Sequence, residues 1–273
     1  MTVAVREGLL RVPDPAAGSF VTATVGLIIT IPVAFIATGA DGATSGELWP
    51  FLLAGLIAPG VAGLLFTLSV ELAGAARAAL LVTAAPLLAA LPAFLILDEP
   101  FHVAIAGGAV LIVAGGVVLG SERLEGTDFK RSGLLIALAA AAVIAVRDNF
   151  ARWAAKHHDV SGIAAGSAAL AGAVVLILAY LLLTRRRRTF ASIRRAVVPF
   201  LPAGVLIAVA YMALLEALNR GRVTVVTPLY ASESFWAVLC AWIFLGRSER
   251  IGPRLLVAAG LMMSGAALIG AFR

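Results

Sequence analysis

Residues 160–184 read VSGIAAGSAALAGAVVLILAYLLLT, a stretch of 25 residues without a single Asp, Glu, Lys or Arg. An α-helix needs about 20 apolar residues to cross the hydrocarbon core of a bilayer. Backbone groups at that depth find no water, so a crossing segment must satisfy them in a helix or in a closed barrel. Because its apolar residues are continuous and do not alternate with polar ones, the stretch predicts a transmembrane helix.

The composition of the whole chain agrees with this segment. Of the 273 residues, 62% are hydrophobic and 13% are charged, and the mean hydropathy is +1.03. Soluble domains are roughly 45–50% apolar and about 25% charged. These values exclude a soluble enzyme, a disordered chain, a disulfide scaffold and a nucleic-acid-binding domain. We expect a multi-pass protein of the cell (plasma) membrane.

Further stretches extend the pattern along the chain. Uncharged runs cover residues 15–40, 48–70, 78–97, 100–121, 160–184 and 196–215, and a slightly shorter one covers 255–272. Two more candidates contain charges. A helix that starts at residue 132 must continue through Arg147 and Asp148 to cross, and the stretch 223–246 carries Glu233 in its middle. The sequence therefore predicts an all-α, polytopic transmembrane helical bundle with nine spans.

A weak internal repeat divides the chain into two halves. The segment Val3-Ala4-Val5-Arg6-Glu7 matches Ile144-Ala145-Val146-Arg147-Asp148 at an offset of 141. Later matches keep the same order at slightly larger offsets; they pair Phe66, Glu71 and Arg77 with Tyr211, Glu216 and Arg222, and Gly115 and Gly120 with Gly265 and Gly270. We predict one repeat over 1–121, a linker over 122–131 and a second repeat over 132–273.

The first repeat is one helix short. Its matched element starts at residue 3, whereas the same element in the second half closes a helix that begins near residue 132. We therefore expect the first repeat to lack most of its first helix and the complete protein to have ten spans, with a genuine nine-helix protein as the alternative. Five spans per repeat place the two repeats in opposite orientations. Such inverted repeats, with a substrate site between them, are typical of secondary transporters.

Two related runs of residues carry a resemblance to a known family. The run over 75–120 contains Arg77, Pro86, Asp98-Glu99, Gly108 and Gly115, and its second-half copy contains Asn219-Arg220-Gly221-Arg222, Pro228, Leu245-Gly246-Arg247 and Gly265. With two repeats of five spans, this pattern resembles the drug/metabolite transporter superfamily, EamA type. It departs from that pattern at Arg247, where Glu99 has no acidic counterpart. The resemblance implies a permease for amino acids, other metabolites or drugs, often an exporter, with both termini in the cytoplasm.

The basic residues predict the opposite orientation. With the first span counted as complete, loops after odd-numbered spans hold fifteen Lys and Arg residues, Arg6 and Arg77 among them, and the other side holds six. Positive charge favours the cytoplasmic side, so this count places the C-terminus outside. The arginine run 185–188 supplies four of the fifteen. We interpret it as a topology determinant at anionic headgroups and not as a nucleic-acid site.

Glu233 is the main candidate for a functional charge. It lies about eleven residues into its span and five residues after Pro228, whose ring removes one backbone hydrogen bond. Ionisable groups in the hydrocarbon region cost about 2.5–3.5 kcal/mol on insertion scales. We interpret Glu233 as a proton-coupling group or a contact for a cationic substrate; a structural hydrogen bond to a neighbouring helix is the alternative. Tyr230, Ser234 and Trp236 lie within a helical turn and are further candidates.

Arg147 and Asp148 form a second candidate group, with Asn149 in the same turn. Adjacent residues point about 100° apart on a helix, so both charges cannot face one partner. We expect one to pair across a cavity, for example with Glu233, and the other to extend toward the membrane interface. A helix end with both charges among the headgroups is the alternative. Tyr211 is a candidate for lining a pocket or for an interfacial aromatic belt.

Prolines and missing motifs complete the set of sequence predictions. Pro86, Pro92 and Pro228 are expected to kink helices around a cavity, and so are Pro59-Gly60 and Pro202-Ala203-Gly204 in two other spans. The histidines lack metal-ligand spacing, and the sequence contains no HExxH, GxSxG or GxxxxGK[ST] motif. We therefore predict no metal, no cofactor and no catalytic residue, which argues against an enzyme.

These observations predict an integral membrane secondary transporter. We expect a permease and exporter of a small metabolite or drug-like molecule, with proton coupling through Glu233. The alternatives are a non-transporting membrane scaffold or sensor and, less favoured, a membrane-embedded enzyme. The expected partners are a small-molecule substrate and the lipid bilayer, with no nucleic acid; a homodimer stays open.

Overall fold

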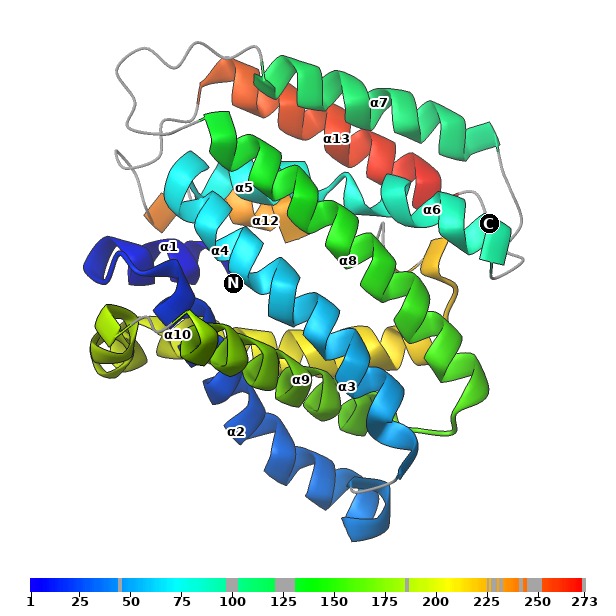
Figure 1. The fold of residues 1–273 in the computed structure, drawn as a ribbon. Coiled ribbons are helices and arrows are strands. Elements are labelled where there is room, and N and C mark those ends of the chain that lie inside the picture. Colours follow the sequence, from blue (N-terminus) through cyan, green and yellow to red (C-terminus); the bar gives the residue numbers. More distant parts are fainter. Residues whose placement is uncertain are drawn as a thin grey trace.

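The computed structural model describes residues 1–43, 46–96, 103–120, 131–184, 187–224, 226, 230, 233–240, 243–244 and 252–271. Over these residues the chain forms a bundle of helices (Figure 1). Five helical segments are long and apolar enough to cross a membrane: Pro15–Gly42, Gly46–Ala73, Arg131–His157, Gly162–Leu183 and Thr189–Arg220. Shorter apolar helices cover Ala75–Ala89 and Pro253–Leu268. The predicted all-α membrane bundle is confirmed.

The first half consists of short helices around two longer ones. In chain order they are α1 (Thr2–Arg11), α2 (Pro15–Ala43), η1 (Gly46–Leu48), α3 (Trp49–Gly55), η2 (Leu56–Val61), α4 (Ala62–Ala73), α5 (Ala75–Val82), α6 (Ala85–Ile96) and α7 (Val103–Gly120). The short α1 is the element that the sequence placed at the end of an incomplete first helix.

The second half begins with three long helices. They are α8 (Arg131–His157), α9 (Gly162–Leu183) and α10 (Arg187–Arg220), and α12 (Glu233–Cys240) and α13 (Pro253–Ala271) follow them. Helix α8 continues through Arg147 and Asp148, as predicted. Its buried face is rich in alanine, and small side chains let neighbouring helices approach closely. This is how a helix that carries two adjacent charges reaches the centre of the bundle.

Helices of the two halves pack against one another, so the halves do not form separate bodies. Helix α2 of the first half lies against α9 and α10 of the second, and α8 lies against α4, α5 and α6 (Figure 1). At another side of the bundle, α7 runs beside α13. Contacts between the halves therefore hold the fold together, and any cavity near its centre is bounded by both.

Two interruptions shape the first half where it meets the second. The span over Trp49–Ala73 is broken at η2, where Ala58 is extended (φ −147°, ψ 126°) and Pro59 follows. The chain then turns between α4 and α5 at Gly74, whose φ of +85° is a conformation that L side chains rarely adopt. A sequence that indicates one continuous span thus forms two half-helices joined by irregular backbone.

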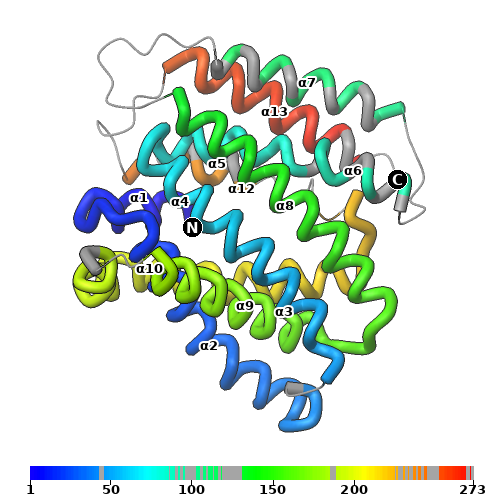
Figure 2. Tube along the Cα trace, in the orientation of Figure 1, coloured from blue at the N-terminus to red at the C-terminus, as the bar shows by residue number. Residues whose placement is uncertain are grey.

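The first half-helix of that broken span, α3, is fixed to α9 by direct backbone contact. A Cβ atom at Gly55 would lie 1.9 Å from the Ala169 carbonyl oxygen, and one at Gly172 would lie 2.1 Å from the Leu52 carbonyl oxygen. Figure 2 shows α3 beside α9 along this contact. Helix α4, beyond the break, packs on α8 instead. The two sides of η2 therefore belong to different helix pairs.

Two arginines lie elsewhere than the charge count assumed. Arg77 was counted as a loop residue, but it lies in α5 and its exposed fraction is 4%. Arg6 lies in α1, and its Nη1 atom donates to the carbonyl oxygens of Val70 (3.2 Å) and Glu71 (3.3 Å) at the end of α4. Both residues lie in helices and not in loops, so they carry little weight in an argument about membrane orientation.

Candidate functional site

A cavity of about 380 Å³ lies between the two halves of the chain. Its first-half wall comes from α1, η2, α4, α5 and the turn after α5, namely Met1, Thr2, Pro59, Ala62, Gly63, Phe66, Ala79, Val82 and Thr83. Its second-half wall comes from α8, α10, Tyr230 and α12, namely Ile144, Arg147, Leu206, Ile207, Ala210, Tyr211, Leu214, Tyr230 and Glu233. The lining is mostly apolar, with its ionisable side chains on the second-half wall, which is typical of a small-molecule site.

Helix α8 brings Arg147 to this cavity and buries it. Its exposed fraction is 1%, and its Cζ atom lies 5.2 Å from the centre of the Tyr211 ring on α10. A guanidinium at this distance from an aromatic face is attracted to the ring. The structure thus joins Arg147 and Tyr211, two candidates that the sequence had named separately.

Asp148 is the charged neighbour of Arg147, and it is fully buried behind the lining. Its Oδ1 atom lies 2.9 Å from Arg147 Nε, although neither atom has a hydrogen bond within the described part of the chain. We expected one of the two side chains to extend toward the membrane interface. Both are buried instead, because α8 continues for nine residues beyond Asp148 and holds the pair inside the bundle.

Asn149 has a positioning role beside the cavity. Its Nδ2 atom donates to the carbonyl oxygen of Ala89 on α6 (3.0 Å) and to that of Ala145 on its own helix (3.0 Å). These bonds tie α8 to α6 at the level of the charged pair. Asn149 is not among the residues that line the cavity.

Tyr230 and Glu233 are the remaining ionisable residues of the second-half wall. Glu233 is the first residue of α12, so the helix begins at the carboxyl side chain within the predicted span 223–246. Trp236 is 59% exposed and does not line the cavity, which fits a side chain directed at lipid. Ser234 lies in the first turn of α12. Pro228 lies outside the described residues.

Two more of the predicted kink residues lie in α6. Pro86 is in the first turn of this helix, where a proline is tolerated because its missing N–H has no partner there anyway. Pro92 is inside the helix. The chain breaks between α5 and α6, just before Pro86, and Thr83 in that break lines the cavity.

Some lining residues could have been found from the repeat. Phe66 matches Tyr211 in the two halves, and both side chains reach the cavity. Pro59 and Gly63 on the broken span carry no signal of this kind, because their role follows from the break at η2. Polar contacts also revise the repeat alignment. Arg152 donates from Nη1 to the carbonyl oxygens of Leu218 and Asn219 at the end of α10, which is what Arg6 does at the end of α4.

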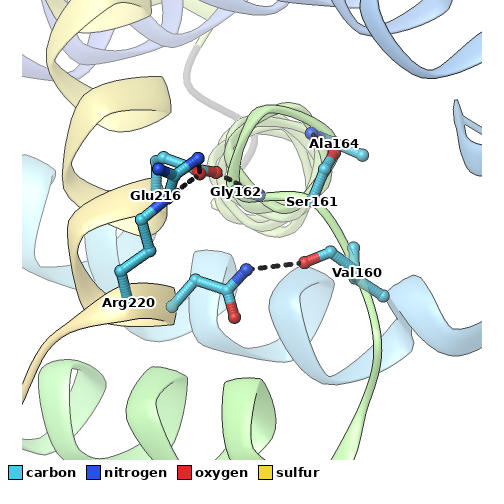
Figure 3. Close-up of polar contacts among 7 residues, drawn as sticks. Val160, Ser161, Gly162, Ala164, Glu216 and Arg220 are labelled. Atoms are coloured by element: carbon cyan, nitrogen blue, oxygen red, sulfur yellow. Dashed lines mark hydrogen bonds and ion pairs between the residues drawn. The ribbon is translucent and has the colours of Figure 1, made fainter.

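Outside the cavity, Glu216 binds the N-terminus of α9. Its Oε2 atom accepts from the Gly162 backbone N–H at 2.9 Å, and Arg220 holds its Oε1 atom at 2.5 Å (Figure 3). Ser161 caps the same helix by accepting from Ala164 N at 3.2 Å. A Cβ at Gly162 would lie 2.2 Å from Glu216 Cα, so this approach requires glycine. Glu216 therefore joins α10 to α9 and does not face the cavity.

Comparison with known proteins identifies the family. The sequence profile of the EamA-like transporter family matches residues 1–121 and, a second time, residues 131–271. The chain belongs to this family. The resemblance inferred from the two runs of the sequence is thereby confirmed.

Structural similarity shows that this EamA protein shares its fold with a solved structure. A solved crystal structure, described only as that of a protein, matches it with a TM-score of 0.66 over 98% of this chain and 93% of that chain, at 21% sequence identity. Similarity at this identity shows a shared fold. A comparison with curated proteins finds no match. The EamA protein is thus a multi-pass membrane protein of a transporter family, and its cavity lies between the two matched regions.

Proposed function

We propose that this EamA protein is a secondary transporter, a permease that exports a small metabolite or drug-like molecule across the plasma membrane. The observation that carries the proposal is the cavity of about 380 Å³, which both family-matched regions line and which places Arg147, Tyr211, Tyr230 and Glu233 in a mostly apolar wall. In secondary transporters the substrate site lies between the repeats near the bilayer midplane.

The broken span suggests how such a site could open to alternate sides. The half-helix α3 packs on α9, whereas α4 packs on α8, and η2 joins them at the cavity through Pro59. Secondary transporters typically combine inverted repeats with discontinuous helices and move one bundle against the other. We propose the same arrangement here, with the two repeats in opposite orientations and η2 as the joint.

Glu233 is the proposed proton-coupling group. It lines the cavity, and a carboxyl group can bind a proton in one state of the transport cycle and release it in another. Arg147, Tyr211 and Tyr230 line the same cavity. A change in the charge of Glu233 therefore changes the electrostatic potential in the substrate site.

Flux through proteoliposomes tests the proposal. Purified protein is reconstituted, and the flux of a metabolite panel is measured with and without a pH gradient for the wild type and for Glu233→Gln. We expect flux in the wild type that responds to the gradient, and flux in Glu233→Gln that does not. Glu7→Gln is the matched control, because Glu7 is 45% exposed and pairs with Arg11 on the surface of α1.

The outcomes separate the competing functions. Flux that ignores both the gradient and the Glu233 substitution would remove proton coupling and leave transport. Absence of flux for every compound would favour the scaffold or sensor. In right-side-out membrane vesicles, flux that runs only inward would reject export.

A further inference from the structure

The permanent charge on the cavity wall is positive. Among the lining residues that the structure describes, Arg147 is the side chain that stays charged at every physiological pH, since a guanidinium does not lose its proton in proteins. Glu233, Tyr211 and Tyr230 can each be neutral. A substrate that enters this cavity therefore always meets one fixed cation.

This cation is incompletely satisfied by the protein. Asp148 balances its charge, with 2.9 Å between Arg147 Nε and Asp148 Oδ1. Within the described chain, however, Nε and Nη1 of Arg147 are buried without a hydrogen-bond acceptor, and both Asp148 oxygens are buried without a donor. Buried donors on a charged group are costly to leave unpaired. Because Arg147 lines the cavity, an acceptor on a bound ligand would meet its guanidinium there.

The surroundings of Arg147 restrict what this ligand can be. The ring of Tyr211, 5.2 Å from Arg147 Cζ, occupies one side of the guanidinium. A planar carboxylate can bind along an edge of a guanidinium through two parallel hydrogen bonds. Most of the rest of the lining is apolar, with Phe66, Ile144 and Leu206 among its larger side chains. This wall would bury the body of a hydrophobic molecule.

We propose that the substrate of this transporter is a small molecule with an apolar body and a carboxylate that binds the Arg147 guanidinium. The proposal rests on the transport function proposed above and names its substrate class. Asp148 is a positioning residue that balances Arg147 while the cavity is empty. Glu233 lines the same cavity, and a carboxyl group that carries a proton does not repel a bound anion.

Binding of matched probes tests this substrate class. The protein in lipid nanodiscs is titrated with three head groups on each of two bodies, and binding is measured by calorimetry. The probes are 3-phenylpropionate, 3-phenylpropanamide, 3-phenylpropylamine, hexanoate, hexanamide and hexylamine. We expect each carboxylate to bind roughly ten- to a hundredfold more tightly than its amide, which is the usual worth of a hydrogen bond to a charged group.

Variants assign the preference to Arg147. Arg147→Gln should reduce the carboxylate-to-amide ratio to about one, whereas Arg147→Lys should keep part of it. Arg152→Gln is the matched control, because Arg152 lies on the same helix, donates to the carbonyl oxygens of Leu218 and Asn219, and does not line the cavity. It should keep the full ratio, which also shows that the fold survives the loss of an arginine from α8.

Several results would overturn the inference. They are equal binding of carboxylate and amide, preference for the amine, no binding of either carboxylate, and an unchanged ratio in Arg147→Gln. Flux of the same probes reports separately on transport. Binding without flux would contradict the proposed function and keep the substrate class, and flux of amides or amines alone would do the reverse.

Discussion

The two walls of the cavity have similar origins and different chemistry. The first-half wall, from Met1 to Thr83, carries no charged side chain among the lining residues that the structure describes. The second-half wall carries Arg147 and Glu233, and it has Tyr211 where the first half has Phe66. Two matched regions of one family thus share the construction of the site, but one of them provides its charge.

Outside the cavity, one polar contact is alike in the two halves. Arg6 and Arg152 each donate from Nη1 to two successive carbonyl oxygens, near the ends of α4 and α10 respectively. Both arginines satisfy backbone groups that a helix end leaves open. The two arginines that bind helix ends are thus equivalent in the two halves, whereas Phe66 and Tyr211 at the cavity differ. Three predictions follow this division from the largest effect to the smallest.

The charged pair of the second-half wall should show the largest effect on stability. Asp148→Asn leaves the Arg147 cation buried without its counter-ion, and removing one partner of a buried ion pair costs about 3–5 kcal/mol. We expect the free energy of unfolding, measured by titrating SDS into dodecylmaltoside micelles, to fall by about this amount. Ala62→Ser on the first-half wall should cost far less, because no charge there loses a partner.

The double variant decides whether the two residues act as a pair. Arg147→Gln combined with Asp148→Asn removes both charges, so it should be more stable than Asp148→Asn alone. Additive losses in this cycle would show that the 2.9 Å contact contributes nothing and that the walls differ only in composition.

The arginines that bind the ends of α4 and α10 should have intermediate and equal effects on stability. Arg6→Gln and Arg152→Gln each remove two charge-assisted bonds to carbonyl oxygens. We expect each to lower the free energy of unfolding by about 1.5–3 kcal/mol in the same titration. A large loss in one variant and none in the other would contradict the equivalence of the two halves outside the cavity.

Much of the fold could be predicted from the sequence, because bilayer length and continuous apolar runs leave few alternatives. Helix α8 was expected to pass through Arg147 and Asp148, since the uncharged run before them is too short to cross. Within the uncharged run 48–70, Pro59-Gly60 predicted a kink, but the full break at η2 was not evident. It depends on packing, because α3 is held against α9 and α4 against α8.

The candidate site was found in part and for a physical reason. Charge inside an apolar span is costly enough to stand out, so Arg147, Asp148 and Glu233 could be named from composition alone. The close approach of Arg147 to Tyr211 depends on how α8 and α10 face each other, which no spacing within either helix encodes. The match of Arg6 with Arg147 followed short sequence similarity, whereas hydrogen bonding pairs Arg6 with Arg152.

The smallest effect concerns the aromatic pair that the repeat places on opposite walls. Tyr211→Leu removes the ring that lies 5.2 Å from the Arg147 guanidinium, and such contacts contribute about 0.5–2 kcal/mol. We expect 3-phenylpropionate to bind about two- to thirtyfold more weakly, measured by calorimetry in nanodiscs. Hexanoate should weaken in parallel, because the lost ring acts on Arg147 and not on the body of the probe.

Phe66→Leu is the matched change on the first-half wall. Phe66 lines the cavity, and no cation lies over its ring in the part of the chain that the structure describes, so its loss removes only apolar contact. Carboxylate and amide probes should therefore weaken by the same factor, and their ratio should stay constant. Tyr211→Phe keeps the ring and should retain most of the ratio. If Phe66→Leu instead lowers the carboxylate-to-amide ratio as far as Tyr211→Leu does, charge recognition is shared by both walls, and the division between them fails.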